Sequence, residues 1–316
     1  MVVSKKILVN DSFDSSGLQL LKENGFELFF GNFNGKELIS FINENQISIL
    51  LIRSATLVTK DVVDFCRSLK IIGRGGVGMD NINEEACKER GIITFNTPGG
   101  STTAVAEMVF AHLFSMHRHI SDCNRIVKDD ICKIKILKRE FSNGLELEGR
   151  TIGIWGPGRI GNEVARIALS LGMKVLMYHP TKKESIIDFN INGNKFHVTI
   201  PVSNLDDFLR NSDIISLHVP HHENPIITED VISKMKQGVM FVNTSRSSNV
   251  NEQALLNALR SGKISKVAID VFSSQPNVAL LLHHNVSVTP HLGASTTEGQ
   301  KKISMELARK LIELTI

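Results

Sequence analysis

The stretch GIWGPGRIGNEVARIALSLGMKVLMYHP, residues 153–180, decides the expected fold. It begins in a short apolar run and then carries Gly156, Gly158 and Gly161 in the spacing G-x-G-x-x-G. Apolar residues at helical spacing follow and share one face, namely Ile160, Val164, Ile167 and Leu171. A second apolar run lies at 174–178. This order predicts a strand, a tight turn, a helix and a second strand parallel to the first.

The three glycines predict what the turn holds. Gly156 permits the tight turn, Gly158 lets the backbone approach a ligand, and Gly161 lets the helix pack closely on the strand. The helix begins near Arg159 and Ile160, where free backbone N–H groups attract an anion. A G-x-G-x-x-G sequence between a strand and a helix therefore predicts a binding turn for the pyrophosphate of a dinucleotide.

The second strand ends in His179, where such units usually carry an acidic residue. The usual carboxylate bonds the ribose hydroxyls and repels a 2′-phosphate, whereas a neutral imidazole still bonds a hydroxyl but repels nothing. Lys182 and Lys183 follow, and they are either a solvated turn or cations that attract a 2′-phosphate. These residues favour NAD and leave NADP open.

The rest of the chain repeats the alternation of short apolar runs with helical patterns, which predicts an α/β fold with parallel sheets covered on both faces. In the first half we expect strands at 5–9, 47–52, 69–73 and 91–95 and helices at 14–24, 35–44, 60–67 and 83–90. A long helix at 101–120 and a charged, irregular stretch at 121–148, either a linker or an oligomer arm, come next.

A second α/β series begins at Thr151. Its expected strands are residues 151–155, 174–178, 213–219, 239–243, 266–270 and 286–289. Ile303, Leu307 and Leu311 then lie four residues apart, which predicts a final helix with one apolar face. The sequence therefore predicts two α/β units.

Composition narrows the class of protein. Of the 316 residues 42% are hydrophobic and 22% are charged, with a net charge of +3, which is ordinary for a globular protein in water. No concentrated basic stripe indicates a nucleic-acid partner. Apolar runs such as SILLI at 48–52 have the length of strands, so no membrane span is expected. The start, MVVSKKILVN, predicts a first strand rather than a signal peptide, and we expect a cytoplasmic protein.

The cysteines show no C-x-x-C spacing. They are Cys66, Cys87, Cys123 and Cys132. In a cytosolic protein this pattern predicts reduced packing residues, and no metal site is expected.

Further motifs give the chain a family resemblance that covers nearly all of its length. They are IRSATLVTKDVVDFCRSLKIIGRGGVGMDNIN (52–83), NTPGGSTTAVAE (96–107), LEGRTIGIWGPGRIG (147–161), SDIISLHVP (212–220), FVNTSR (241–246), AIDVF (268–272) and TPHLGAST (289–296). Together they resemble the D-isomer-specific 2-hydroxyacid dehydrogenases, most closely their D-3-phosphoglycerate dehydrogenase branch.

The resemblance implies two Rossmann-like, doubly wound domains with a cleft between them. Residues 1–99 with 291–316 would form a flavodoxin-like substrate-binding domain, and 100–290 would form the NAD(P)-binding Rossmann domain. The family is typically dimeric through the cofactor domain, and residues 121–148 would belong to that contact. The chain would be a short form without the C-terminal regulatory domain of longer relatives, so serine feedback through that domain is not expected.

The resemblance also implies hydride transfer between a nicotinamide cofactor and a D-2-hydroxy acid. Arg246 would hold the substrate carboxylate, assisted by the backbone N–H groups of Gly75, Gly76 and Val77. His291 would be the acid/base. Asp270 would hold the nicotinamide amide. The implied cofactor contacts are Gly156, Gly158, Arg159, Ile160, Gly161, His179, His218, Pro220, Thr244, Ser245, Arg246, Asp270, His291 and Gly293.

The substrate implied by the branch is 3-phospho-D-glycerate or 3-phosphohydroxypyruvate, which would place the enzyme in serine biosynthesis. Arg53 and Arg74 would supply cations for the phosphate. Lys138 and Arg139 resemble basic residues that act near a neighbouring subunit's site, although they also suit a solvated charge run.

Three departures from the family pattern leave alternatives open. His179 is the first. Ser247 and Ser248 stand where the family has glycines, before Val250-Asn251, and would be strained if their φ were positive. Gln275 replaces the family's catalytic Glu, so it orients the imidazole but cannot stabilise imidazolium by charge.

The alternatives are therefore another glyoxylate or hydroxypyruvate reductase, or a catalytically weakened NAD(H)-binding regulatory protein. Formate dehydrogenases also carry Gln at this place. They have a longer N-terminal region, and this chain lacks it, so formate ranks lower.

Overall fold

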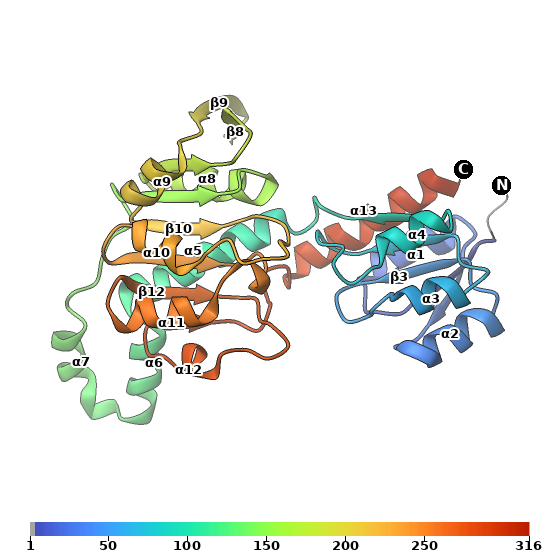
Figure 1. Cartoon of the computed structure of the whole chain (residues 1–316), viewed down its shortest axis with the longest axis horizontal. Coiled ribbons are helices and arrows are strands. Elements are labelled where there is room, and N and C mark those ends of the chain that lie inside the picture. The colour runs from blue at the N-terminus through green and yellow to red at the C-terminus, as the bar shows by residue number, and fades with distance from the viewer. Residues whose placement is uncertain (1–3, 316) are drawn as a thin grey trace. The chain divides into compact units, whose positions relative to one another are not determined.

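A computed structural model describes residues 4–315 of the chain. The chain divides into two compact units (Figure 1). Unit 1 runs to Thr102 and resumes at Ala294, and unit 2 is Thr103–Gly293. The division falls at 102 and 293, close to the residues 99 and 290 expected from the sequence.

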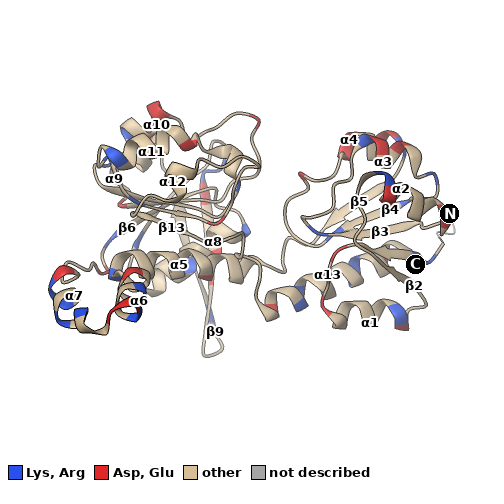
Figure 2. Ribbon diagram, turned by 90° about the horizontal axis from the view of Figure 1, so that it is seen from below, with Lys and Arg blue, Asp and Glu red and all other residues tan. Residues whose placement is uncertain are grey.

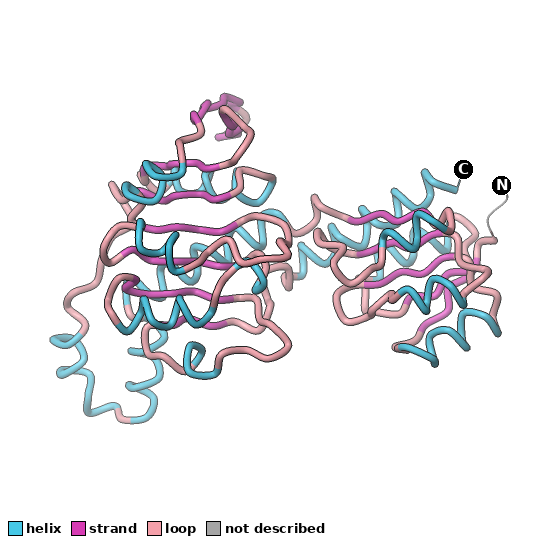
Figure 3. The backbone as a smooth tube through the Cα atoms, in the orientation of Figure 1, coloured by secondary structure: helices cyan, strands magenta, loops and turns pink. Residues whose placement is uncertain are grey.

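Unit 1 is a five-stranded parallel sheet in the order β2-β1-β3-β4-β5, covered by helices (Figure 3). This order is that of flavodoxin-like doubly wound folds. The strands are β1 Lys6–Val9, β2 Glu27–Phe30, β3 Ile49–Ile52, β4 Ile71–Arg74 and β5 Ile93–Asn96. The helices are α1 Ser15–Glu23, α2 Gly35–Glu44, α3 Lys60–Phe65, α4 Glu84–Glu89 and α13 Thr297–Thr315.

Apolar side chains on both faces of the unit 1 sheet explain this arrangement. The central strand β3, ILLI, is buried at every position, as a parallel strand covered on both faces requires. On α13 the predicted face of Ile303, Leu307 and Leu311 is buried, so the last segment of the chain completes the first unit. Gly17 allows α1 to approach α13 closely, because a Cβ there would lie 2.3 Å from the carbonyl oxygen of Ser304.

Unit 2 is a six-stranded parallel sheet in the order β13-β12-β11-β10-β6-β7. Its strands are β6 Thr151–Trp155, β7 Lys174–Tyr178, β10 Ile214–Leu217, β11 Val239–Asn243, β12 Ile264–Ile269 and β13 Val286–Val288. Its helices are α5 Thr102–Arg118, α6 Ile120–Asp129, α7 Ile134–Glu140, α8 Arg159–Ser170, α9 Leu205–Asn211, α10 Glu229–Lys234, α11 Glu252–Arg260 and α12 Val278–Leu281. All six strands predicted for the second series occur close to the positions of the apolar runs.

An antiparallel hairpin interrupts the α/β alternation of unit 2 after β7. It consists of β8, Glu184–Ile191, and β9, Asn194–Pro201. Asn192 and Gly193 form its two-residue turn with φ of 51° and 85°, as the favoured tight hairpin turn requires. Beyond the hairpin, parallel pairing with β7 is reduced to one isolated bridge, Met177 to Val202. The hairpin therefore stands where a doubly wound sheet usually continues with a helix and a further strand.

The stretch 121–148 is largely helical, which corrects the expectation of an irregular segment. Helices α6 and α7 are joined by a short 3-10 turn at Ile131–Lys133. Lys, Arg, Asp and Glu recur along both helices (Figure 2). The helical pattern of this stretch was hard to recognise because polar residues separate the apolar positions Val127, Ile131 and Ile134, which lie four and three residues apart. Whether the stretch is a linker or an oligomer arm stays a prediction.

The four cysteines are free thiols, but only two are packing residues as expected. Cys66 and Cys87 are buried in unit 1, and burial raises the pKa of each thiol to about 11. Cys123 is half-buried and Cys132 is exposed. Within residues 4–315 no helix is long and apolar enough to cross a bilayer, and no group of acidic, His and Cys side chains is placed to hold a metal ion.

Candidate cofactor and catalytic site

In the glycine turn between β6 and α8, other atoms occupy the space beside two of the glycines, and the space beside the third is empty. Gly156 has φ of 100°, and a Cβ there would lie 2.5 Å from the carbonyl oxygen of His218. A Cβ at Gly161 would lie 2.3 Å from the carbonyl oxygen of Gly156. At Gly158 a Cβ would meet nothing within 4 Å. The first and third glycines are therefore required by the fold itself, whereas Gly158 leaves space beside the backbone.

The start of α8 suits an anion in that space. Gly158 is the N-cap residue and, as a glycine, has no side chain to cap the first backbone N–H groups of the helix, which begin at Arg159 and Ile160. Lys182 brings a positive charge to the same turn, because its Nζ lies 2.7 Å from the carbonyl oxygen of Pro157. Free N–H groups, the helix dipole and a nearby cation together fit a diphosphate.

His179 is held in one orientation by the turn that follows it. Its Nδ1 accepts hydrogen bonds from the backbone N–H groups of Thr181 and Lys182, both at 3.1 Å. Since Nδ1 is an acceptor, the proton of the neutral ring lies on Nε2. The side chain therefore offers a ribose hydroxyl a donor and no negative charge, and Lys182 is engaged at the glycine turn rather than lying in a merely solvated loop.

The turn after β11 positions three of the predicted site residues. Asn243 fixes it: Oδ1 accepts from the N–H and the hydroxyl of Ser245 at 3.0 and 2.8 Å, and Nδ2 donates to the carbonyl of Arg246 at 2.9 Å. The guanidinium of Arg246 donates through Nη1 to the carbonyl of Ser245 at 2.8 Å. Thr244 Oγ1 is buried, and the described residues offer it no hydrogen-bond partner. A buried hydroxyl of this kind fits a polar group of a bound cofactor.

Ser247 and Ser248 are not strained. With Asn249 they form a 3-10 turn, and among the described residues the non-glycine positions with positive φ are Gln46, His119, Asn192 and His291. The strain that the two serines would suffer at positive φ therefore does not arise. Asn249, which lies outside the sequence motifs, is fully buried and connects this turn to the loop after β10. Its Nδ2 donates to the carbonyl of Pro220 at 2.9 Å.

His218 lies at the start of that loop, opposite Gly156. Its Nε2 is 2.8 Å from the hydroxyl of Ser216. Desolvation lowers the pKa of His218 to about 3. The imidazole is therefore neutral at physiological pH, and it acts on a neighbouring ligand through shape and hydrogen bonding rather than through charge.

The predicted acid/base, His291, lies on a tightly held turn after β13. Its φ is 57°, and its N–H donates to the carbonyl of Thr289 at 3.0 Å. The next two N–H groups, of Leu292 and Gly293, donate to the two carboxylate oxygens of Asp270, each at 2.8 Å. Asp270 thus stabilises the turn of His291. This structural role was not predicted from the sequence, which indicated a contact of Asp270 with the nicotinamide amide. That role stays a prediction.

Gln275 lies in the irregular segment between β12 and α12, and its side chain is exposed. Its predicted place beside the imidazole of His291 stays a prediction.

In unit 1 Arg53 directly follows β3, whereas Arg74 is the last residue of β4 and does not lie in the loop that the sequence had led us to expect. Arg53 is held by its backbone: its N–H donates to the carboxylate of Asp11, and its carbonyl accepts from Asn81 Nδ2 at 2.6 Å. Its Nε is buried, with no hydrogen-bond partner among residues 4–315. Desolvation lowers the pKa of Arg53, and the charge of Asp11 opposes the shift. A second anion close to this guanidinium would be bound strongly.

In the loop after β4, which was predicted to bind the substrate carboxylate, two of the three expected backbone N–H donors already have partners within the protein. The N–H of Gly75 donates to the carbonyl of Ile52 at 2.8 Å, and the N–H of Gly76 donates to Thr97 Oγ1 at 2.8 Å. Both groups are therefore used within unit 1. Val77 is exposed, and of the three it keeps its N–H available in the described chain.

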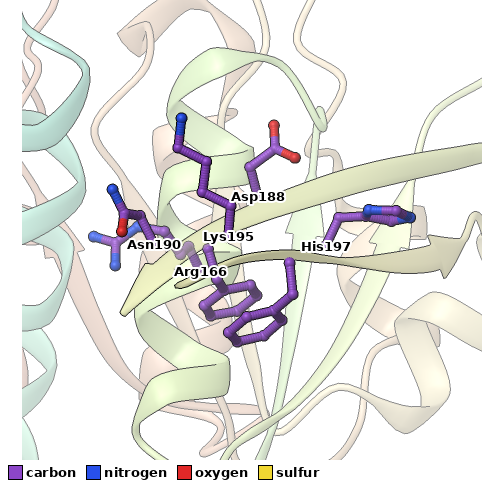
Figure 4. Close-up of a pocket in the computed structure, with 7 residues that line it drawn as sticks. Arg166, Asp188, Asn190, Lys195 and His197 are labelled. Carbon is purple, nitrogen blue, oxygen red and sulfur yellow. The ribbon is translucent and has the colours of Figure 1, made fainter. Parts of the chain in front are cut away.

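A hollow of about 520 Å³ lies on the hairpin of unit 2 (Figure 4). It is lined by one residue of α8 and six of the hairpin: Arg166, Asp188, Phe189, Asn190, Lys195, Phe196 and His197. The rings of Phe189 and Phe196 stack there with centroids 4.9 Å apart. None of the residues predicted from the sequence motifs lines this hollow, so it is separate from the glycine turn.

Comparison with known proteins agrees with this geometry. Residues 110–293 match the family model "D-isomer specific 2-hydroxyacid dehydrogenase, NAD binding domain". The chain belongs to this family. The matched segment covers the glycine turn, the turn after β11 and the turn of His291, so the second unit is the NAD-binding domain.

Individual relatives differ in the length over which they match. A hydroxypyruvate reductase of Thermotoga maritima is 38% identical over 98% of this chain and 97% of its own length. A D-3-phosphoglycerate dehydrogenase of Bacillus subtilis is 35% identical over 98% of this chain, but the chain spans only 56% of it. Among solved structures, an NADPH-dependent glyoxylate/hydroxypyruvate reductase from Sinorhizobium meliloti has a TM-score of 0.81 at 26% identity, covering 97% of this chain and 93% of that one.

Proposed function

We propose that the chain is a nicotinamide-dependent oxidoreductase that interconverts short 2-keto acids and D-2-hydroxy acids, with hydroxypyruvate as its first candidate substrate. The observation that carries the proposal is the turn of His291, held by the carboxylate of Asp270 in the same unit as the open glycine turn. A histidine on a rigid turn is suited to proton transfer near neutral pH.

In this proposal, each site residue has a separate role in the hydride-transfer reaction. Bound NAD(H) supplies or accepts the hydride. His291 gives a proton to the keto oxygen during reduction and removes it during oxidation. Arg246 holds the substrate carboxylate through its planar guanidinium. Gly158 and the first N–H groups of α8 hold the cofactor diphosphate, and the hydroxyl of Thr244 bonds a polar group on the nicotinamide side.

The choice of hydroxypyruvate is supported by the match over nearly the full length of both chains to a hydroxypyruvate reductase. The 3-phosphorylated acid, which the sequence motifs favoured, is the second candidate, because the buried Nε of Arg53 lacks a partner among the described residues and would bind a phosphate.

For the cofactor we propose NAD with weak discrimination against NADP. The Nε2–H of His179 bonds a ribose hydroxyl without repelling a 2′-phosphate, and the cation of Lys182 lies at the glycine turn. A related structure is described as NADPH-dependent, which is consistent with a family that accommodates both cofactors.

We also propose a homodimer in which α6 and α7 contact a second copy. Four isoleucines of this segment are at least half exposed: Ile120, Ile131, Ile134 and Ile136. Apolar side chains so exposed on neighbouring helices indicate a partner surface. Light scattering on the purified chain should give the mass of two chains, and an Ile134→Glu variant should shift it toward one.

The test of the proposed activity is steady-state oxidation of NADH with hydroxypyruvate, glyoxylate and 3-phosphohydroxypyruvate. The matched variant is His291→Asn, because Asn tolerates a left-handed backbone and keeps the turn while removing the acid/base. We expect kcat to fall by about a hundredfold or more, with NADH affinity unchanged. Equal kcat in the two proteins would rule out His291 as the acid/base, and no turnover of any of the three acids by wild type would rule out the proposed activity.

A further inference from the structure

A buried histidine on α5 is hydrogen-bonded to the strand that leads to His291. His112 is only 3% exposed. Its Nδ1 lies 2.8 Å from the hydroxyl of Ser287, and its Nε2 lies 3.0 Å from the hydroxyl of Thr289. Both ring nitrogens are thus hydrogen-bonded, as burial of a polar side chain requires, and both bonds go to the segment that precedes His291.

The donors and acceptors of this cluster have one consistent direction. The hydroxyl of Thr289 donates to Asp270 Oδ1 at 2.5 Å, and the same carboxyl group accepts two backbone N–H groups. The threonine oxygen then accepts from His112, which places the ring proton on Nε2. Nδ1 is left to accept from Ser287. The result is a chain of hydrogen bonds that runs from Ser287 through His112 and Thr289 to Asp270.

Asp270 connects this series of hydrogen bonds to the turn that carries His291. The carboxylate is 1% exposed, and it accepts from the N–H groups of Leu292 and Gly293. His291, with φ of 57°, lies between these groups and Thr289, whose carbonyl accepts its N–H. A non-glycine residue in this region persists only where the surroundings fix it. The groups that fix the backbone of His291 are Asp270 and Thr289. Both belong to the series of hydrogen bonds that starts at His112.

We propose that His112 is a positioning residue for His291: it orients Asp270 through Thr289 and thereby sets the backbone from which the imidazole acts. This rests on the proposed function, in which His291 transfers the proton. Burial lowers the pKa of His112, which keeps the ring neutral and lets it act as a hydrogen-bond donor at physiological pH.

The test compares His112→Leu, which keeps volume but breaks the chain, with His112→Gln, whose amide supplies a donor near the position of Nε2. His117→Leu is the matched control: His117 is a buried histidine on the same helix, and its Nδ1 lies 2.9 Å from the carbonyl oxygen of Leu113, in its own helix. For keto-acid reduction we expect His112→Leu to lower kcat about tenfold, since small displacements of a catalytic group have effects of this order. KM and NADH affinity should stay within about threefold of wild type.

The pH profile separates positioning from general destabilisation. The limb of kcat that reports the proton of His291 should move in His112→Leu, return in His112→Gln and stay in place in His117→Leu. If His112→Leu and His117→Leu match in kcat and in profile, the proposal is overturned. Should the leucine variant fail to fold, Thr289→Val breaks the next bond of the chain and Thr289→Ser restores it, with the same two outcomes.

A measurement that does not depend on activity keeps this inference apart from the proposed function. In protein labelled with ¹⁵N-histidine, the nitrogen spectrum of His112 should show a neutral ring with its proton on Nε2. A proton on Nδ1, or a charged ring at neutral pH, would overturn the chain of hydrogen bonds. Failure of the wild type to turn over any keto acid would instead count against the proposed function and leave the tautomer result standing.

Discussion

The first turn of each unit follows the first strand of a parallel sheet, yet the two turns are built in opposite ways. In unit 1 the turn after β1 is filled by Asn10, which is 1% exposed. Its Nδ2 donates to the carbonyl of Phe33 at 2.9 Å and lies 2.8 Å from Thr56 Oγ1, while its Oδ1 accepts from the N–H of Phe33 at 2.9 Å. In unit 2 the corresponding turn has Gly158, beside which a Cβ would meet nothing within 4 Å.

The difference shows that the fold alone does not make the site. Both sheets are doubly wound, and in such sheets ligands bind at the carboxyl ends of the strands. Unit 1 uses this place for its own side chains, whereas unit 2 keeps it open and puts the start of a helix and Lys182 beside it. Our proposal for the cofactor site therefore rests on particular residues rather than on the topology.

The largest expected effect contrasts an arginine of each unit. Arg246→Lys keeps the charge but loses the planar pair of donors, so we expect kcat/KM for every 2-keto acid to fall about a hundredfold, with NADH affinity unchanged. Arg53→Lys should weaken only phosphorylated acids. Steady-state kinetics with hydroxypyruvate and its 3-phosphate checks both. An Arg246→Lys enzyme with wild-type turnover would show that the carboxylate is held elsewhere.

The next effect breaks the two first turns separately. Gly158→Val fills the open space, so NADH affinity should fall at least about tenfold while thermal stability stays near wild type. Asn10→Ala should do the reverse: it removes three buried hydrogen bonds and costs about 1–3 kcal/mol of stability, with NADH affinity intact. Nicotinamide fluorescence titration and thermal unfolding measure the two quantities. The contrast fails if Gly158→Val unfolds readily or if Asn10→Ala loses the cofactor.

A smaller effect concerns His179, which has no counterpart in unit 1. His179→Asp restores a negative charge while its carboxylate can still accept from the N–H groups of Thr181 and Lys182. The ratio of kcat/KM for NAD over NADP should rise about fivefold to tenfold because the 2′-phosphate is repelled. Lys183→Ala, a neighbouring exposed lysine, serves as the control and should change the ratio less. A wild type already thousands-fold selective for NAD would contradict this account of His179.

The smallest expected effect is the pH dependence of stability, which has opposite sign in the two units. Burial lowers the pKa of His112 and His117 in unit 2. The unfolded chain therefore binds more protons as pH falls below about 6.5, and unit 2 loses stability there. Burial raises the pKa of Cys66 and Cys87 in unit 1 to about 11, so unit 1 loses stability as pH rises above about 9.

Shifts of about 2–4 °C in the unfolding midpoint are expected at pH 5.5 and pH 9.5 relative to pH 7.5. Trp155 is the single tryptophan of the chain and belongs to unit 2, so its fluorescence follows that unit while far-ultraviolet circular dichroism follows both. A tryptophan transition that is more sensitive to alkali than to acid would contradict the assignment.

The apolar runs predicted the parallel strands of both units because a buried parallel strand is apolar throughout, as in ILLI at 49–52. Strand β2, ELFF, was not predicted because an edge strand is half-exposed and too short to show a pattern. The hairpin β8–β9 was not predicted either, although Asn192-Gly193 between alternating residues is a strong hairpin signal. It was missed because a regular alternation of helices and parallel strands was expected to continue after β7.

For the site, spacing alone identified the glycine turn, because that motif is local in sequence. The residues that fix the predicted side chains were harder to find, since their partners are distant along the chain. His112 is joined to Thr289 across 177 positions. Asn249 reaches Pro220, and Gly75 and Gly76 turn out to use their N–H groups within unit 1. A polar residue inside the apolar helix segment MVFAHLFSM was the one sequence signal of the His112 network.

We propose that the open glycine turn of unit 2 holds the nicotinamide cofactor, and amide hydrogen exchange with and without NADH tests this most directly. NADH should slow exchange at residues 156–162 and 244–246 of unit 2 and leave the first turn of unit 1, residues 10–17, unchanged. Unchanged exchange at 156–162 in the presence of saturating NADH, or protection confined to unit 1, would contradict the claim.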